Sequence, residues 1–179
     1  MRGIGEKFPA FSLTGVVSSD ASNAFKVIDA TSFPGKWRVV FFWPKDFTFV
    51  CPTEVIAFGK MNADFLAREA QLLGVSVDSE YVHLAWRRAR NDLSLLPFPM
   101  LSDIKRELSG ELGVLDPVAG VCQRATFIVD PQDVIRFVYV TDLNVGRSPE
   151  EVLRVLDALQ TGDLCACNWK HGDAPLRAA

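Results

Sequence analysis

The residues from Arg38 to Trp43 constrain the fold more than any other part of the sequence. They read Arg-Val-Val-Phe-Phe-Trp, and a run of β-branched and aromatic residues without polar alternation is typical of a strand buried on both faces of a sheet. The apolar part of this run, Val39 to Trp43, is far too short to cross a bilayer. The run therefore predicts a central strand of an α/β sheet.

A helix is predicted directly after this strand. It begins near Pro52, because proline is favoured at the first helical position. Four apolar residues behind the proline recur at helical spacing, namely Val55, Phe58, Met61 and Phe65. An apolar strand at 72–77 and a helical stretch from about 79 to 91 then repeat the order. These elements predict a βαβα succession.

The second half of the chain predicts a hairpin and a closing helix. Two β-rich runs, 125–129 and 134–140, flank the sequence Asp-Pro-Gln-Asp, a turn composition that joins antiparallel strands. Ser148 then precedes Pro149 and a glutamate at the third helical position, Glu151, a pattern typical of a helix N-terminus. The closing helix should span about three turns.

A βαβ unit followed by a ββα unit is the order of elements in the thioredoxin fold. We expect a thioredoxin-like α/β domain over residues 1–160, enlarged by extra N-terminal strands, and a C-terminal tail over residues 161–179. The segment from Gly15 to Asn23 is rich in small polar residues and is expected to form a surface loop. No repeat or linker-like stretch divides the chain.

The charge and the cysteine content argue against several functional classes. The 19 basic and 22 acidic residues give a formal net charge of −3, which offers no attraction for a phosphate backbone or an anionic lipid surface. Four cysteines in 179 residues are too few for a disulfide-stapled secreted scaffold. The first seven residues lack the apolar segment of a signal peptide. We expect a cytoplasmic protein that binds neither nucleic acid nor a membrane.

Cys51 is the candidate reactive residue. It lies between the predicted central strand and the following helix, and loops at the carboxyl ends of such strands are where α/β proteins build their sites. In the first turn of the helix, unpaired backbone N–H groups and the helix dipole would stabilise a thiolate. Position alone leaves open the alternative of a buried, unreactive cysteine.

The residues around Cys51 resemble the active-site signature of the peroxiredoxins, Pro-x-x-x-Thr-x-x-Cys. Pro44, Thr48 and Cys51 match it in register. The string from Phe41 to Glu54 is similar to the typical two-cysteine branch, especially the alkyl hydroperoxide reductase C type of actinobacteria, and the resemblance extends along essentially the whole chain. It implies a peroxidase for hydrogen peroxide, organic hydroperoxides and peroxynitrite. An external dithiol reductant would recycle it, and thioredoxin, a flavoprotein disulfide reductase and an alkylhydroperoxidase-type adaptor are all compatible.

The chemistry of peroxide reduction explains the three signature residues. A thiolate attacks one oxygen of the O–O bond in line, and the charge that develops on the leaving oxygen needs fixed hydrogen-bond donors. Cys51 is thus the expected peroxidatic cysteine. The Thr48 hydroxyl can donate to the peroxide, and Pro44, which lacks an N–H, helps keep water from the thiolate. No metal, haem or flavin is implied.

The resemblance adds charged and aromatic residues to the expected site. It implies that the guanidinium of Arg124 stabilises the thiolate and contacts the substrate, whereas Arg124 by itself would be interpreted as a surface arginine. Glu54 and Arg147 match family positions that support this arginine. Trp86 and His83 match a family segment near the active-site loop and the ring interface, where a structural role is expected for His83.

The other three cysteines have different expected roles. A sulfenic acid on Cys51 needs a second thiol, since it otherwise proceeds to irreversible oxidation states. The tail resembles the family segment Val-Cys-Pro-x-x-Trp, which implies Cys165 as the resolving cysteine, an intersubunit disulfide to Cys51 in an antiparallel homodimer, and a ring of dimers, usually a decamer. Cys167 leaves open which tail thiol reacts first. Cys122 matches no redox position and is expected to be a packed core thiol.

Three alternative functions compete with a peroxidase. A thioredoxin-type oxidoreductase needs Cys-x-x-Cys, but Glu54 occupies the position of the second cysteine. A metal site built from Cys165, Cys167 and His171 supplies three ligands, where structural zinc sites use four. The sequence is silent on a holdase or scaffolding role.

Overall fold

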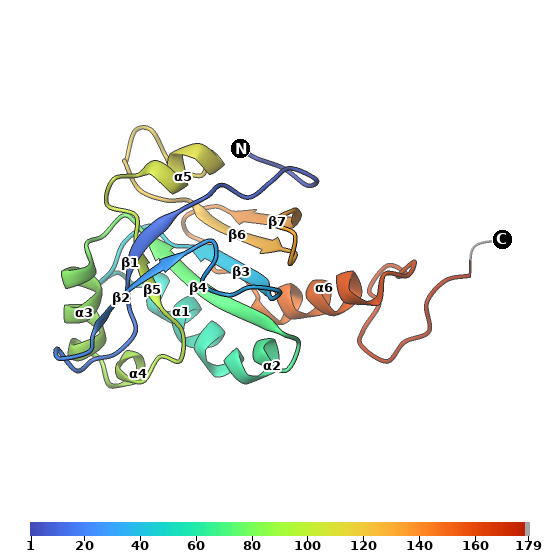
Figure 1. Cartoon of the computed structure of the whole chain (residues 1–179), viewed down its shortest axis with the longest axis horizontal. Helices are drawn as coiled ribbons and strands as arrows, with labels where there is room; N and C mark the ends of the chain where they lie inside the picture. Colours follow the sequence, from blue (N-terminus) through green and yellow to red (C-terminus); the bar gives the residue numbers. More distant parts are fainter. Residues whose placement is uncertain (178–179) are drawn as a thin grey trace.

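The computed structural model describes residues 1–177, and within them a seven-stranded mixed sheet forms the centre of the fold (Figure 1). The strands are β1 Ser12–Val16, β2 Phe25–Asp29, β3 Trp37–Phe42, β4 Ala70–Ser76, β5 Met100–Ser102, β6 Arg124–Val129 and β7 Ile135–Thr141. Their order across the sheet is β2-β1-β5-β4-β3-β6-β7. β3 pairs in parallel with β4, as a βαβ unit requires, and antiparallel with β6, which forms the predicted hairpin with β7.

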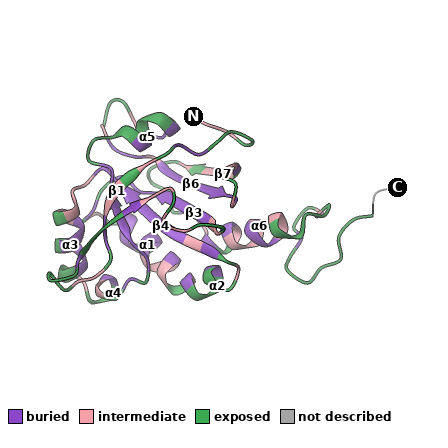
Figure 2. Cartoon of the chain, in the orientation of Figure 1, coloured by how far each residue is buried: buried purple, intermediate pink, exposed green. Residues whose placement is uncertain are grey.

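Helices cover both faces of the sheet. They are α1 Cys51–Lys60, α2 Asn62–Leu66, α3 Glu80–Ala89, α4 Asn91–Ser94, α5 Glu107–Leu112 and α6 Pro149–Thr161. Val39 and Phe41 of β3 pack in a core with side chains of α1 to α4 and α6, whereas Val40 and Phe42 pack in a second core with side chains of α5. All four are fully buried, and Figure 2 shows β3 coloured mostly as buried. This double burial explains why the run is apolar at successive positions, and it confirms the predicted internal strand.

Part of the expected loop between Gly15 and Asn23 is a strand. Gly15 and Val16 belong to β1, which pairs with β2 on one side and β5 on the other. A Cβ atom on Gly15 would lie 2.7 Å from Cδ2 of Leu101. The small residue therefore serves close packing on the sheet, and the expectation of a loop was wrong at these two positions.

The helix expected behind Pro52 is divided in two. Met61 has backbone angles of φ −94° and ψ 4°, so α1 ends at Lys60 and α2 begins at Asn62. Cys51 occupies the first helical position and Pro52 the second. The closing helix α6 begins as predicted, since the Ser148 side chain accepts a hydrogen bond from the backbone N–H of Glu151 at 3.2 Å.

The chain leaves the body of the protein after α6 (Figure 1). Gly162 ends the helix in the left-handed conformation, and Leu164 then forms an isolated bridge with Leu176. The expected division into a domain over 1–160 and a tail over 161–179 stays a prediction, and residues 178–179 lie outside the described part. Among residues 1–177, no helix combines the length and apolar character that a bilayer crossing needs.

Candidate active site

A pocket of about 210 Å³ lies at the N-terminus of α1 and brings together four of the predicted site residues. Pro44, Thr48, Cys51 and Arg124 line it. The first three come from the β3–α1 connection and the start of α1, whereas Arg124 is the first residue of β6. Because β6 runs antiparallel beside β3, its first residue lies next to the carboxyl end of β3. The pairing of β6 with β3 therefore places Arg124 next to Cys51.

Cys51 and Arg124 are in direct contact inside this pocket. Nη1 of Arg124 donates a hydrogen bond to Sγ of Cys51 at 3.4 Å, and both residues are buried. Cys51 is also the first residue of α1, where the positive end of the helix dipole lies. Two sources of positive charge thus adjoin the sulfur.

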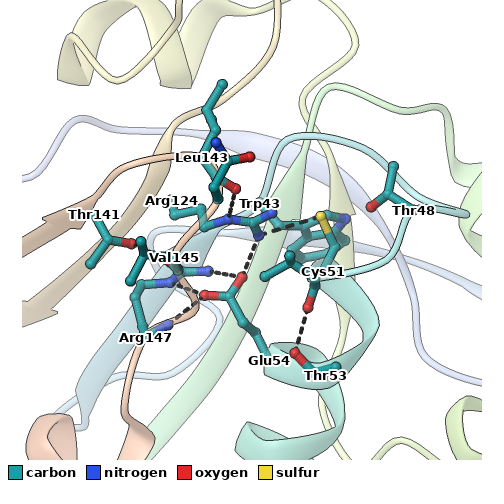
Figure 3. Close-up of polar contacts among 12 residues, drawn as sticks. Trp43, Thr48, Cys51, Thr53, Glu54, Arg124, Thr141, Leu143, Val145 and Arg147 are labelled. Atoms are coloured by element: carbon teal, nitrogen blue, oxygen red, sulfur yellow. Dashed lines mark hydrogen bonds and ion pairs between the residues drawn. The ribbon is translucent and has the colours of Figure 1, made fainter.

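Glu54, one turn further along α1, joins Arg124 to Arg147 (Figure 3). Its Oε2 accepts from Nη1 of Arg124 at 2.6 Å and from Nη2 of Arg147 at 3.0 Å. Its Oε1 accepts from the backbone N–H and Nε of Arg147 at 2.9 and 2.7 Å. Burial alone would raise the pKa of Glu54, but hydrogen bonds and charge from Arg147, with the charge of Arg124, outweigh it and hold this pKa below its usual value. Glu54 is therefore a buried carboxylate in its charged form.

Both arginines are also anchored to the backbone. Nε of Arg124 donates to the carbonyl of Leu143 at 2.7 Å. Nη1 of Arg147 donates to the carbonyl of Ala125 at 2.7 Å and to the hydroxyl of Thr126 at 3.1 Å. These contacts leave the Arg124 guanidinium little freedom, so its Nη1 is held against the sulfur.

Thr48 lies on the other side of the sulfur from Arg124 (Figure 3). Its hydroxyl donates to the carbonyl of Lys45 at 3.0 Å. Because Thr48 lines the pocket, this hydroxyl can donate to a bound peroxide once it turns away from Lys45.

The four cysteines all lie within residues 1–177 and are free thiols. Cys122 is buried, and burial, followed by the charge of Asp103, raises the pKa of its thiol to about 12. This agrees with the packed, unreactive thiol expected from the sequence. Cys165 is half-buried beside the end of α6, and Cys167 is exposed.

A family model described as the AhpC/TSA family matches residues 4–138 of the chain. The chain belongs to the AhpC/TSA family. It is 58% identical to alkyl hydroperoxide reductase C of Mycobacterium tuberculosis over 183 residues, covering 98% of this chain and 93% of that protein. It is 42% identical to peroxiredoxin-2 of Macaca fascicularis over 181 residues, covering 97% of this chain and 89% of that protein.

Solved structures give the same result. The structure titled Mycobacterium tuberculosis AhpC superposes with a TM-score of 0.86 and 57% identity, covering 95% of this chain and 99% of that one. Reduced Plasmodium vivax 2-Cys peroxiredoxin superposes with a TM-score of 0.89 and 36% identity, covering 98% and 93% of the two chains. The thioredoxin-like fold and the peroxiredoxin resemblance are thereby confirmed, and the chain is a thiol-dependent peroxidase. Family membership implies an oligomeric assembly and a thiol reductant in general terms.

The pocket around Cys51 also contains two residues that the sequence did not indicate. They are Leu143 and Asn144, which follow β7. Lys45, Phe49 and Val50, which belong to the signature string, complete the lining. Leu143 has two roles, because it lines the pocket and its carbonyl accepts the hydrogen bond from Nε of Arg124. No local signal in the sequence marks a residue after an edge strand as part of a site.

Asp46 was likewise missed, although it lies inside the family signature. Its carboxylate accepts from Nε1 of Trp43 at 2.8 Å and contacts Nδ1 of His83 at 2.7 Å, and its backbone N–H donates to Asp78 at 2.9 Å. These buried contacts hold the loop that carries Pro44 and Thr48. His83 is thus a support beneath the loop, as expected.

Trp86 does not line the pocket. The centroid of its ring lies 6.1 Å from that of Phe47 in the active-site loop and 6.4 Å from that of Trp43. It lies near the loop as expected, and it has no part in the hydrogen-bonded network of Glu54.

Proposed function

We propose that this AhpC/TSA-family protein reduces hydrogen peroxide and organic hydroperoxides, and peroxynitrite as a further substrate, through Cys51. The observation that carries the proposal is the 3.4 Å contact between Nη1 of Arg124 and the sulfur of Cys51 inside the pocket. The relatives named alkyl hydroperoxide reductase C support the organic substrates.

The first step is an attack of the Cys51 thiolate on one peroxide oxygen. An S–O bond forms as the O–O bond breaks. The leaving group departs as hydroxide or alkoxide, which takes up a proton, or as nitrite when the substrate is peroxynitrite. Arg124 and the Thr48 hydroxyl are the donors that stabilise the developing charge, and Pro44 excludes water from the sulfur. The products are a sulfenic acid on Cys51 and water from hydrogen peroxide, an alcohol from an organic hydroperoxide, or nitrite from peroxynitrite.

The second step joins Cys51 to a tail cysteine of a second subunit. Each chain gives its tail to its partner in an antiparallel homodimer, and dimers assemble into a ring. Cys165 is the resolving thiol, with Cys167 as the alternative. The free state of all four cysteines and the departure of the tail from the body after α6 support this arrangement. Resolution yields an intersubunit disulfide and releases water.

An external dithiol protein then reduces this disulfide. Thioredoxin, a flavoprotein disulfide reductase and an alkylhydroperoxidase-type adaptor all carry the required pair of thiols. Because free thiols persist in reducing compartments, the proposed location is the cytoplasm.

The catalytic proposal is tested by comparing two cysteine variants. We expect Cys51→Ser to lose peroxide reduction, measured as peroxide consumed in the presence of dithiothreitol, because a hydroxyl at this position is not ionised at neutral pH. Cys122→Ala is the matched control and should keep the wild-type rate, since Cys122 is a buried thiol outside the pocket. Full activity of the Cys51→Ser protein would refute the proposal.

The intersubunit disulfide is tested by non-reducing electrophoresis and peptide mapping after one equivalent of peroxide. Wild type should run as a covalent dimer, Cys51→Ser as a monomer, and Cys165→Ser should lose most of the dimer if Cys165 resolves. Cys167→Ser should retain the dimer. A wild-type band that stays monomeric would contradict the intersubunit model.

A further inference from the structure

The part of the tail that carries Cys165 and Cys167 folds into a turn against α6. The backbone N–H of Trp169 donates to the carbonyl of Ala166 at 3.1 Å, and the Trp169 side chain is buried. Sγ of Cys165 lies 3.8 Å from the carbonyl of Ala158 and 3.5 Å from the hydroxyl of Thr161, both in α6. The turn is thus docked on the helix with Cys165 at the contact and Cys167 exposed.

Arg154 of α6 holds this turn. Its Nη1 donates to the carbonyl of Trp169 at 3.0 Å, while its Nε and Nη2 bind the carboxylate of Glu151 at 2.7 and 2.8 Å. The pair with Glu151 orients the guanidinium, because a fork with two parallel bonds has one geometry. The free donor is thereby directed at the tail.

We propose that Arg154 is a positioning residue for the resolving step: through the Trp169 carbonyl it docks on α6 the tail turn that carries Cys165 and Cys167. The inference rests on the proposed function, because it takes the tail cysteines as the resolving thiols. The thiolate sulfur attacks the sulfur of the partner's oxidised cysteine, an S–S bond forms and the S–O bond breaks. The hydroxide that leaves takes a proton and becomes water.

The test compares Arg154→Gln and Arg154→Lys in single-turnover experiments on the full-length protein. Rapid mixing with peroxide followed by acid quench and mass spectrometry separates oxidation of Cys51 from formation of the disulfide. In Arg154→Gln, Cys51 should be oxidised at the wild-type rate, but the disulfide should form about tenfold more slowly, the effect of one lost hydrogen bond to a charged group. Sulfinic acid on Cys51 should accumulate as a consequence.

Thiol accessibility separates docking of the tail turn from a general effect on the fold. In reduced Arg154→Gln, Cys165 should be alkylated faster than in wild type, because the undocked turn exposes its sulfur. Arg154→Lys should restore the slower alkylation, because a lysine ammonium can also donate to the Trp169 carbonyl. The matched control is Arg90→Gln, which removes an arginine that also binds a carboxylate with two bonds, that of Asp92, outside the tail contact. It should match wild type in every readout.

The outcomes distinguish the inference from the function on which it rests. If wild type forms no disulfide between Cys51 and a tail cysteine, the proposed function fails. If wild type forms it and Arg154→Gln forms it at the same rate, with Cys165 alkylated as slowly as in wild type, the role of Arg154 is refuted. A slower disulfide-forming rate with unchanged alkylation of Cys165, in a variant whose circular dichroism and melting temperature match wild type, would refute docking of the turn as the cause.

Discussion

Arg124 donates to Glu54 at 2.6 Å from the same nitrogen, Nη1, that lies 3.4 Å from the sulfur of Cys51. A carboxylate and a reactive thiol therefore share one cation. Because Glu54 and the thiol lie one turn apart on α1, the helix sets the separation of the two acceptors. Arg147 supplies a second cation to Glu54, so that the network of two arginines retains a positive charge for the sulfur.

Replacing Glu54 by glutamine should destabilise the protein and slow its reaction with peroxide. Arg124 and Arg147 would lose their shared buried counter-charge, and removing one partner of such a pair costs about 3–5 kcal/mol. Urea unfolding measures the free energy, and stopped-flow mixing measures the rate constant. Asp92→Asn is the matched control, because it breaks an exposed pair with Arg90, which should cost less than about 1 kcal/mol. Equal losses in the two variants would contradict the prediction.

The lowered pKa of Glu54 predicts a loss of stability in acid. Its folded-state pKa lies below that of the unfolded chain, so the carboxylate contributes stability that is fully present above the unfolded value, about 4.3. That stability is lost as the pH falls through the folded value. Unfolding free energies measured from pH 7 downward should therefore drop more steeply for wild type than for Glu54→Gln. Parallel curves below the unfolded value would show that Glu54 is not the group responsible.

The hydroxyl of Thr48 should be needed for the chemical step and not for the fold. Thr48→Val removes a donor to the developing charge, which lowers the rate of Cys51 oxidation by about a hundredfold, whereas Thr48→Ser retains the donor and most of the rate. Melting temperatures should stay close to wild type, because the only hydrogen bond lost is the exposed one to Lys45. A valine variant as fast as the serine variant would remove Thr48 from the mechanism.

Cys122 should resist alkylation in the folded protein. A thiol with a pKa of about 12 is ionised in only about one molecule in 10⁴ at pH 8, and it is buried as well. Iodoacetamide followed by peptide mass spectrometry should label Cys167 first and Cys122 only after addition of denaturant. Rapid labelling of Cys122 in the native protein would contradict its assignment as a core thiol.

The order of elements was predictable because each signal for it is local. An apolar run identifies β3, and Ser148 with Pro149 identifies the start of α6, whatever the rest of the chain does. β5, three residues long, escaped detection because so short a strand has no period to recognise, and it is defined by pairing with β1 and β4. The expectation of a loop was wrong at Gly15 because the residue that requires a glycine there, Leu101, lies far along the chain.

The site residues likewise divide into those that a local pattern identifies and those that only long-range contacts explain. Pro44, Thr48 and Cys51 lie within eight positions of one another, so their spacing alone resembled a known signature. Arg124 was expected only through that resemblance, and the structure explains its place by the pairing of β6 with β3. Asp46 carries no local signal, because its partner His83 lies in α3, far along the chain.

The sequence by itself determined that a cysteine begins a helix after a buried strand, because strand burial and helix initiation depend on neighbouring residues. Only the tertiary structure decided that Glu54 would hold Arg124 against that cysteine. The physical reason is burial, because a charged carboxylate and a charged guanidinium that are removed from water must be paired. The register of β3 and β6 brings Arg124 within reach of Glu54.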